Sequence, residues 1–291
     1  MRASSAAVLC AASLLLAPLT IPSTASAQSI SKDPDLGKES GKKGKKGKKG
    51  KKGKKGKKGG ENAATGPFKK KDYPTKELKR PLVLPNGMGE VGANATFGSV
   101  AGTEYLTLGP TFHYGVADVV EFGVGTDLLL VPDVDWSRSL PIDAHFLAVD
   151  TKQVDFAPGI ILPLTFVDGA PFGLTLDAPV RIIAGDKLFF MVGQGAVPLF
   201  LSPDFAMSLS ANGGVYYQLQ KEVVLGLDTN VFNLALAPDV AATGPWDFLQ
   251  LGFMGQYSWS NMGDVGAKVN LMTVYDVGTS ATVQAYGNFR F

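Results

Sequence analysis

The two histidines of the chain, His113 and His145, are the residues whose type most readily supports chemistry. With neighbouring carboxylates, imidazole nitrogens can bind a divalent metal ion or act with water as an acid/base pair. Nucleophilic catalysis by a His-x-Ser pair is excluded, because Gly115 and Leu147 stand two residues after the histidines. A hydrogen-bonded network that fills the interior of the fold is the simpler interpretation. We therefore predict no catalytic residue, no metal ligand, no cofactor and no enzyme activity, with the metal and acid/base interpretations as alternatives.

The histidines belong to a larger set of charged side chains that sequence alternation places on one face of their segments. The acidic members are Glu90, Glu121, Asp127, Asp143, Asp155, Asp177 and Asp228, and the basic members are Arg181, Lys268 and Arg290. Carboxylates outnumber bases in this set. A water-filled interior lined by these side chains would therefore favour cations.

The elements that must position these residues are strands, because apolar and polar residues alternate through residues 86–291. The first segment shows the pattern, with Val91, Ala93, Ala95 and Phe97 on one face and Glu90, Gly92, Asn94 and Thr96 on the other. Turn signals divide the region into about twelve strands, an even number as in single-chain bacterial barrels. Their ranges are roughly 88–99, 103–115, 118–131, 141–150, 153–166, 172–184, 187–201, 204–218, 222–236, 246–259, 264–275 and 279–291.

Loop lengths support an antiparallel closed arrangement. Short links such as 116–118 follow even-numbered strands, whereas long links such as 132–140 follow odd-numbered ones, so both chain ends lie on one side. A soluble barrel also alternates, but its polar face would be rich in lysine and glutamate, whereas here it is mainly small and uncharged. Prolines inside the predicted strands oppose any closed ladder: Pro110, Pro158, Pro163 and Pro179. We predict an all-β fold, an antiparallel transmembrane β-barrel.

The first 85 residues have a different composition. Residues 1–27 combine Arg2, an apolar stretch and the small-residue site Ala25-Ser26-Ala27, which predicts a secretory signal peptide. Its removal would take away Cys10, the only cysteine. Residues 28–85 are predicted to be a disordered basic periplasmic segment with Lys-Lys-Gly repeats. The repeated lysines are Lys42, Lys43, Lys45, Lys46, Lys48, Lys49, Lys51, Lys52, Lys54, Lys55, Lys57 and Lys58.

The formal net charge of +2 conceals a strong division along the chain. Residues 28–80 hold 20 Lys and Arg against 6 Asp and Glu, a net +14, and residues 81–291 hold 7 against 20, a net −13. Export removes nucleic acid as a partner for the basic segment. Anionic cell-wall polymer and lipopolysaccharide are the polyanions that its lysines could bind electrostatically. The basic segment could also fold back toward the acidic barrel and gate it.

The chain ends in Tyr286-Gly287-Asn288-Phe289-Arg290-Phe291, an aromatic terminus preceded by apolar residues at every second position. With the signal peptide and the alternating body, this ending resembles Gram-negative outer-membrane β-barrel proteins of the porin-like kind. The resemblance implies that the barrel assembly machinery recognises Tyr286, Phe289 and Phe291 as an assembly signal. It also implies a location in the bacterial outer membrane, in contact with its lipid, with the N-terminal tail in the periplasm.

These sequence features are compatible with three functions. The expected one is a passive, porin-like channel for small cationic or neutral solutes. The alternative is a non-conducting structural barrel that tethers the outer membrane to anionic envelope polymers. An envelope hydrolase that uses the lumenal histidines and carboxylates is the least favoured.

Overall fold

The structure is a computed structural model, described here for residues 73–100, 103–136, 138–166, 172–202, 205–236, 248–274 and 278–291. The predicted signal peptide and the Lys-Lys-Gly repeats lie outside the described residues, so they stay predictions. Within the described part of the chain, no helix is long and apolar enough to span a membrane.

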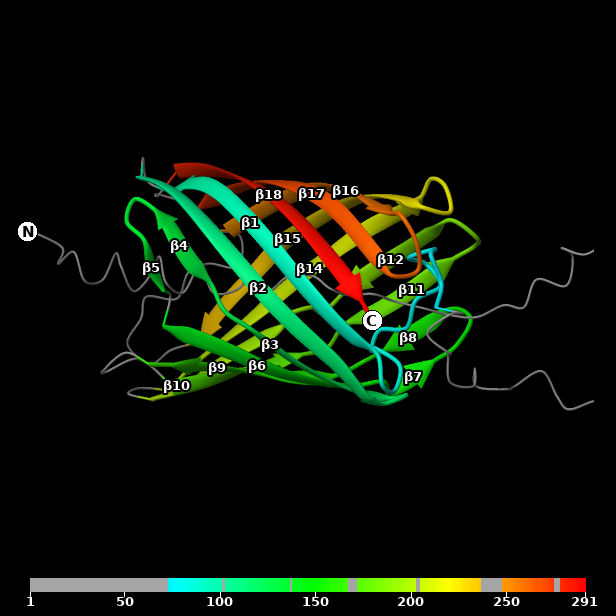
Figure 1. The fold of residues 1–291 in the computed structure, drawn as a ribbon. Coiled ribbons are helices and arrows are strands. Elements are labelled where there is room, and N and C mark those ends of the chain that lie inside the picture. Colours follow the sequence, from blue (N-terminus) through cyan, green and yellow to red (C-terminus); the bar gives the residue numbers. More distant parts are fainter. Residues whose placement is uncertain are drawn as a thin grey trace, which may run out of the picture.

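In the described part of the chain, eighteen strand segments make up one antiparallel sheet (Figure 1). They are β1 (Gly89–Val100), β2 (Thr103–Ala117), β3 (Val120–Gly125), β4 (Leu128–Val131), β5 (Asp135–Trp136), β6 (Ser139–Phe146), β7 (Val149–Asp150), β8 (Val154–Phe156), β9 (Gly159–Thr165), β10 (Phe172–Asp177), β11 (Val180–Ala184), β12 (Leu188–Val192), β13 (Val197–Ser202), β14 (Ala206–Gln218), β15 (Val223–Leu236), β16 (Phe248–Ser258), β17 (Gly263–Val274) and β18 (Gly278–Arg290). Several segments continue one another, so the sheet forms a closed barrel of twelve strands, as predicted.

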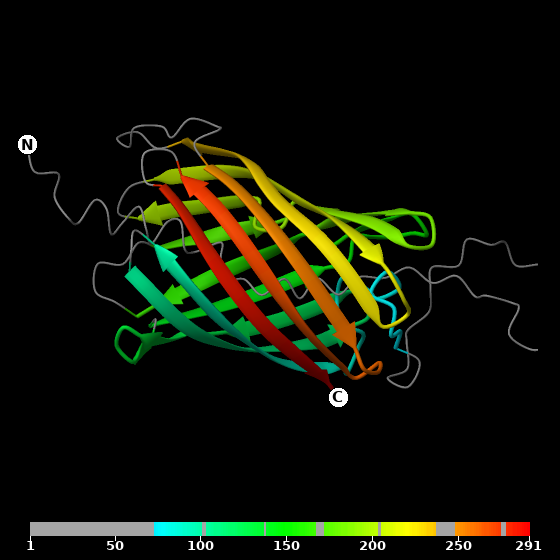
Figure 2. The same ribbon diagram turned by 90° about the horizontal axis from the view of Figure 1, so that it is seen from above.

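The barrel closes where β1 pairs with both β2 and β18. Glu90 of β1 lies opposite His113 of β2 on one side and opposite Arg290 of β18 on the other. The first strand is therefore hydrogen-bonded to the last strand, which closes the sheet. Closure satisfies the backbone groups that an open sheet edge would leave unpaired. Figure 2 shows the strands inclined to the barrel axis, as closure of a sheet requires.

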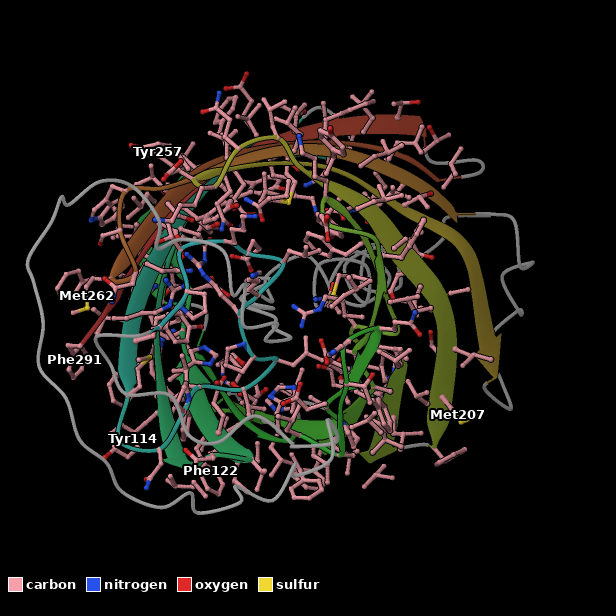
Figure 3. The ribbon with its side chains drawn as sticks, turned by 90° about the vertical axis from the view of Figure 1, so that its right-hand side faces the viewer. Tyr114, Phe122, Met207, Tyr257, Met262 and Phe291 are labelled. Carbon is pink, nitrogen blue, oxygen red and sulfur yellow. The ribbon has the colours of Figure 1, made fainter. Side chains whose placement is uncertain are left out.

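The two faces of the wall differ in polarity, as the alternation predicts. Large apolar side chains are exposed on the outside, among them Val91, Phe97, Phe253 and Val283. Tyr114, Phe122, Tyr257 and Phe291 lie on the outer side of the ring in Figure 3. Charged and polar side chains are buried on the inside. An apolar exterior around a polar interior is the arrangement of a transmembrane barrel.

Two of the prolines explain why some barrel strands are divided. Pro158 separates β8 from β9, and Pro179 separates β10 from β11, because proline has no N–H to donate to the ladder. Their carbonyls still pair: the Phe146 N–H donates to Pro158 O at 2.9 Å, and the Ala157 N–H donates to Pro179 O at 3.1 Å. The prolines therefore interrupt the ladder locally without opening the barrel.

Residues 73–88 fold into one end of the barrel instead of lying outside it. This end carries the short turns, including 117–120 and 218–223, and Phe291, and we call it the short-loop end (Figure 1). Figure 3 looks into it, and residues 73–88, which we call the plug, cross its opening. The sequence predicts a disordered basic segment over residues 28–85, but residues 73–85 of that segment pack into the barrel; we call residues 28–72 the basic arm. The physical reason is that Leu78, Leu82 and Val83 pack against apolar wall residues inside the barrel.

Candidate functional site: the lumen and its plug

Arg80 anchors the plug to the barrel wall. Its guanidinium is fully buried and donates to both carboxylate oxygens of Asp264 on β17, at 2.7 and 2.8 Å. It also donates to Glu77 Oε2 at 2.6 Å and to Ser258 Oγ at 3.0 Å. The carbonyls of Pro74 and Thr75 accept its remaining bonds, each at 3.1 Å. A buried charge is tolerated only when it is paired and hydrogen-bonded in this way.

The surrounding charges keep the Arg80 guanidinium protonated. Burial alone would lower the pKa of Arg80, but the carboxylates of Glu77 and Asp264 outweigh burial and raise it. Asp264 also accepts a hydrogen bond from Arg290 on β18. One buried carboxylate therefore joins the plug, through Arg80, to the strand that closes the barrel.

Hydrogen bonds from the plug backbone reach other parts of the wall. The Leu78 N–H donates to Gln218 Oε1 of β14 at 3.1 Å, and the Leu84 N–H donates to the Glu121 carboxylate of β3. Arg181 of β11 donates to the Arg80 carbonyl at 3.1 Å. Because β3, β11, β14 and β17 lie around the barrel, the plug is held from several sides.

Apolar contacts also hold the plug inside the barrel. Leu78, Leu82 and Val83 form one buried cluster with wall residues that include Phe189, Tyr216 and Val224. The rings of Phe189 and Tyr216 stack with their centroids 4.9 Å apart. Tyr73, Leu84 and Met88 form a second cluster within the plug itself, and the guanidinium groups of Arg80 and Arg290 lie over the Tyr73 ring at 5.9 and 5.3 Å. Burial of this apolar surface favours the inserted position of the plug.

The predicted lumenal charges all point inward, and most are paired with one another. Arg181 pairs with Asp155, and both side chains are fully buried. Lys268 Nζ lies 2.6 Å from Asp228, and Arg290 Nε lies 2.7 Å from Glu90. Asp127 is half-buried and forms no ion pair within the described part of the chain. The remaining acidic members contact the two histidines.

Both histidines lie on the inner face beside carboxylates. His113 Nδ1 lies 2.9 Å from Glu121 Oε1. His145 lies between two aspartates, with Nε2 2.8 Å from Asp177 and Nδ1 3.3 Å from Asp143. The structure therefore brings together the His/carboxylate pairs that the sequence placed on one face. Their role in selectivity stays a prediction.

The residues predicted to form the assembly signal divide between the two faces. Phe289 and Phe291 are exposed on the outside, whereas Tyr286 points inward and donates to Gln256 Oε1 at 3.1 Å. The lysines predicted to bind polyanions lie outside the described residues.

The sequence did not predict that Arg80, Glu77 and Asp264 would form one group. A signal was present, because the apolar stretch 82–84 between two prolines is unlike the basic residues before it.

No protein-family model matches the chain, and no curated protein sequence matches it. Among solved structures, the NanC porin is similar with a TM-score of 0.52 and 10% identity, over 68% of this chain and 98% of that chain. An outer membrane channel from Pseudomonas putida F1 is similar with a TM-score of 0.51 and 9% identity, over 72% of this chain and 97% of that chain. At these identities the similarity establishes the fold, which is that of outer-membrane porins and channels.

Proposed function

We propose that the protein is an outer-membrane channel that its own plug closes at the short-loop end. The observation that carries the proposal is the insertion of residues 73–88 into a barrel with a charged interior, fixed by Arg80 on Asp264. Similarity to a porin and to an outer membrane channel supports the channel. Displacement of the plug would expose a lumen through which small solutes could pass.

The charges of the interior support a preference for cationic or neutral solutes. Each of the basic residues Arg80, Arg181, Lys268 and Arg290 lies against a carboxylate, so none presents a free positive charge to the lumen. Asp127 has no ion pair among the described residues and can act on passing ions. An interior with an excess of carboxylates attracts cations and repels anions.

The proposed location is the bacterial outer membrane, with the short-loop end and the basic arm in the periplasm. The apolar exterior supports contact with lipid, and the exposed Phe289 and Phe291 support recognition of the last strand by the barrel assembly machinery. The plug follows the basic arm directly in the sequence. Anionic cell-wall polymer or lipopolysaccharide bound to the arm would therefore act close to the plug.

A non-conducting structural barrel is the second candidate, and the buried plug favours it. Planar-bilayer recordings distinguish the two when the intact protein is compared with a variant lacking residues 73–84. Heat-modifiable migration on a denaturing gel checks that the variant is folded. We expect rare openings for the intact protein and steady, cation-selective conductance for the variant. A folded variant that gives no current at any voltage would instead support the structural barrel.

A further inference from the structure

Three side chains from three adjacent parts of the wall converge inside the barrel. His113 of β2, Glu121 of β3 and Asp143 of β6 each offer one ligand atom, and these atoms all lie within 4.8 Å of one another. We call these three residues the His113 cluster. His113 and Glu121 are only 8% and 6% exposed, whereas Asp143 is half-buried, so two of the three ligands are shielded from solvent.

The strand register explains how residues from separate strands meet. Gly123 of β3 lies between His113 and Asp143, directly opposite both. A Cβ atom on Gly123 would collide with the Asp143 carboxylate. Because Gly123 has no side chain, the Asp143 carboxylate can occupy this space and approach His113 and Glu121.

No lysine or arginine of the described residues pairs with the carboxylates of the cluster. Glu90 lies opposite His113 and is paired with Arg290, whereas the basic partners of Glu121 and Asp143 among the described residues are His113 and His145. Asp143 Oδ2 is buried and accepts no well-aligned hydrogen bond from the described residues, its nearest base being His145 Nδ1 at 3.3 Å. Buried carboxylates require a positive partner to offset the loss of hydration.

We propose that the His113 cluster binds a divalent transition-metal ion, with Zn²⁺ as the preferred probe. One imidazole nitrogen and two carboxylate oxygens form a ligand set that Zn²⁺ accepts in proteins, and the imidazole disfavours Mg²⁺ and Ca²⁺. A tetrahedral ion with bonds of about 2.1 Å holds its ligand atoms about 3.4 Å apart. Ligand atoms that already lie within 4.8 Å need only small side-chain rotations to reach that spacing.

The site lies directly against the plug. The second oxygen of Glu121 accepts the Leu84 N–H while the first faces His113. An ion bound to Glu121 would therefore fix the orientation of a carboxylate that also holds the plug backbone. This metal site does not depend on whether the barrel conducts.

Calorimetric titration of the purified barrel with ZnCl₂ tests the proposal. The exported protein, without a polyhistidine tag, is first stripped with a chelator, and residual metal is measured by mass spectrometry. We expect saturable binding of about one Zn²⁺ per chain, weakened about tenfold or more by His113→Gln and by Asp143→Asn. Asp228→Asn is the matched control, because Asp228 is a lumenal carboxylate paired with Lys268 outside the cluster.

Two outcomes would overturn the site. One is the absence of saturable Zn²⁺ binding to the folded intact protein, with folding checked by heat-modifiable migration. The other is equal Zn²⁺ affinity in the intact protein, in His113→Gln and in Asp228→Asn. Substitution of Co²⁺ adds a spectroscopic readout, since its visible absorption changes when imidazole is lost as a ligand. A Co²⁺ spectrum that is unchanged in His113→Gln would equally exclude His113 as a ligand.

Discussion

At the scale of single residues, Arg80 holds a charge deep inside the barrel mouth. Its substitution by Ala would leave Arg290 as the sole basic partner of the buried Asp264 carboxylate among the described residues. Breaking a buried ion pair costs about 3–5 kcal/mol, which corresponds to roughly a hundredfold or more in the equilibrium between the inserted and released plug. Hydrogen–deuterium exchange of peptides that cover residues 73–88 should therefore be at least about a hundredfold faster in Arg80→Ala.

Lys79→Ala is the control for that measurement, because Lys79 is adjacent in sequence, half-buried and outside the ion-pair network of the described residues. Its exchange should match that of the intact protein. Equal exchange in both variants would show that the apolar clusters, and not the buried ion pair, hold the plug.

The sequence predicted the direction of the lumenal side chains but not their partners. Period-two alternation is enough to place Asp155 and Arg181 on the inner face. Their pairing depends on the register of β8 against β11, which places Arg181 opposite Asp155. Register depends on contacts across strands, so the alternation of a single strand does not determine it.

At the scale of elements, β2 has a glycine where the plug lies against it. The Gly115 N–H donates to Met88 O at 3.0 Å, and the Gly87 N–H donates to Gly115 O at 2.8 Å. A Cβ atom on Gly115 would collide with the backbone carbonyls of Leu84 and Pro85. Backbone atoms cannot rotate away as a flexible side chain can, so the plug itself would have to move.

Gly115→Ala is therefore expected to displace the plug, at a cost of about 1–3 kcal/mol, as for other overpacked sites. Limited proteolysis of the folded protein should cut residues 73–88 faster in this variant. Gly255→Ala is the matched control, because a Cβ there meets only Leu225 Cδ2, at 3.8 Å. If the two variants resist the protease equally, β2 does not set the position of the plug.

The contrast between strands and plug shows what periodicity can reveal. Each of the twelve barrel strands has two chemically different faces, so alternation located them and the closed fold followed. The plug shows no alternation of apolar and polar residues, because it contacts the barrel on several sides at once. Leu78 and Val83 pack on the wall, while Glu77 and Arg80 form an ion pair in the interior. Its role depends on a barrel that encloses it, which local sequence does not show.

At the scale of the whole molecule, the chain joins a polycationic arm to an acidic barrel through the plug. Residues 28–80, which comprise the arm and the first half of the plug, carry a net +14, and residues 81–291 carry a net −13. Attraction between these regions would draw the arm toward the barrel and favour the inserted plug. Such attraction extends over about 30 Å at 0.01 M salt but only about 3 Å at 1 M.

Replacement of the repeated lysines between Lys42 and Lys58 by glutamine removes the charge of the arm and keeps its length. Conductance in planar bilayers should then rise at low salt, because the plug loses an electrostatic contribution to its closed position. At 1 M salt the substituted and intact proteins should conduct alike, since screening has already removed that contribution. Deletion of residues 41–60 should give the same salt dependence if charge, and not length, is responsible. Equal conductance of intact and substituted proteins at low salt would mean that the arm does not act on the plug, whose position would then rest on Arg80 and the apolar clusters alone.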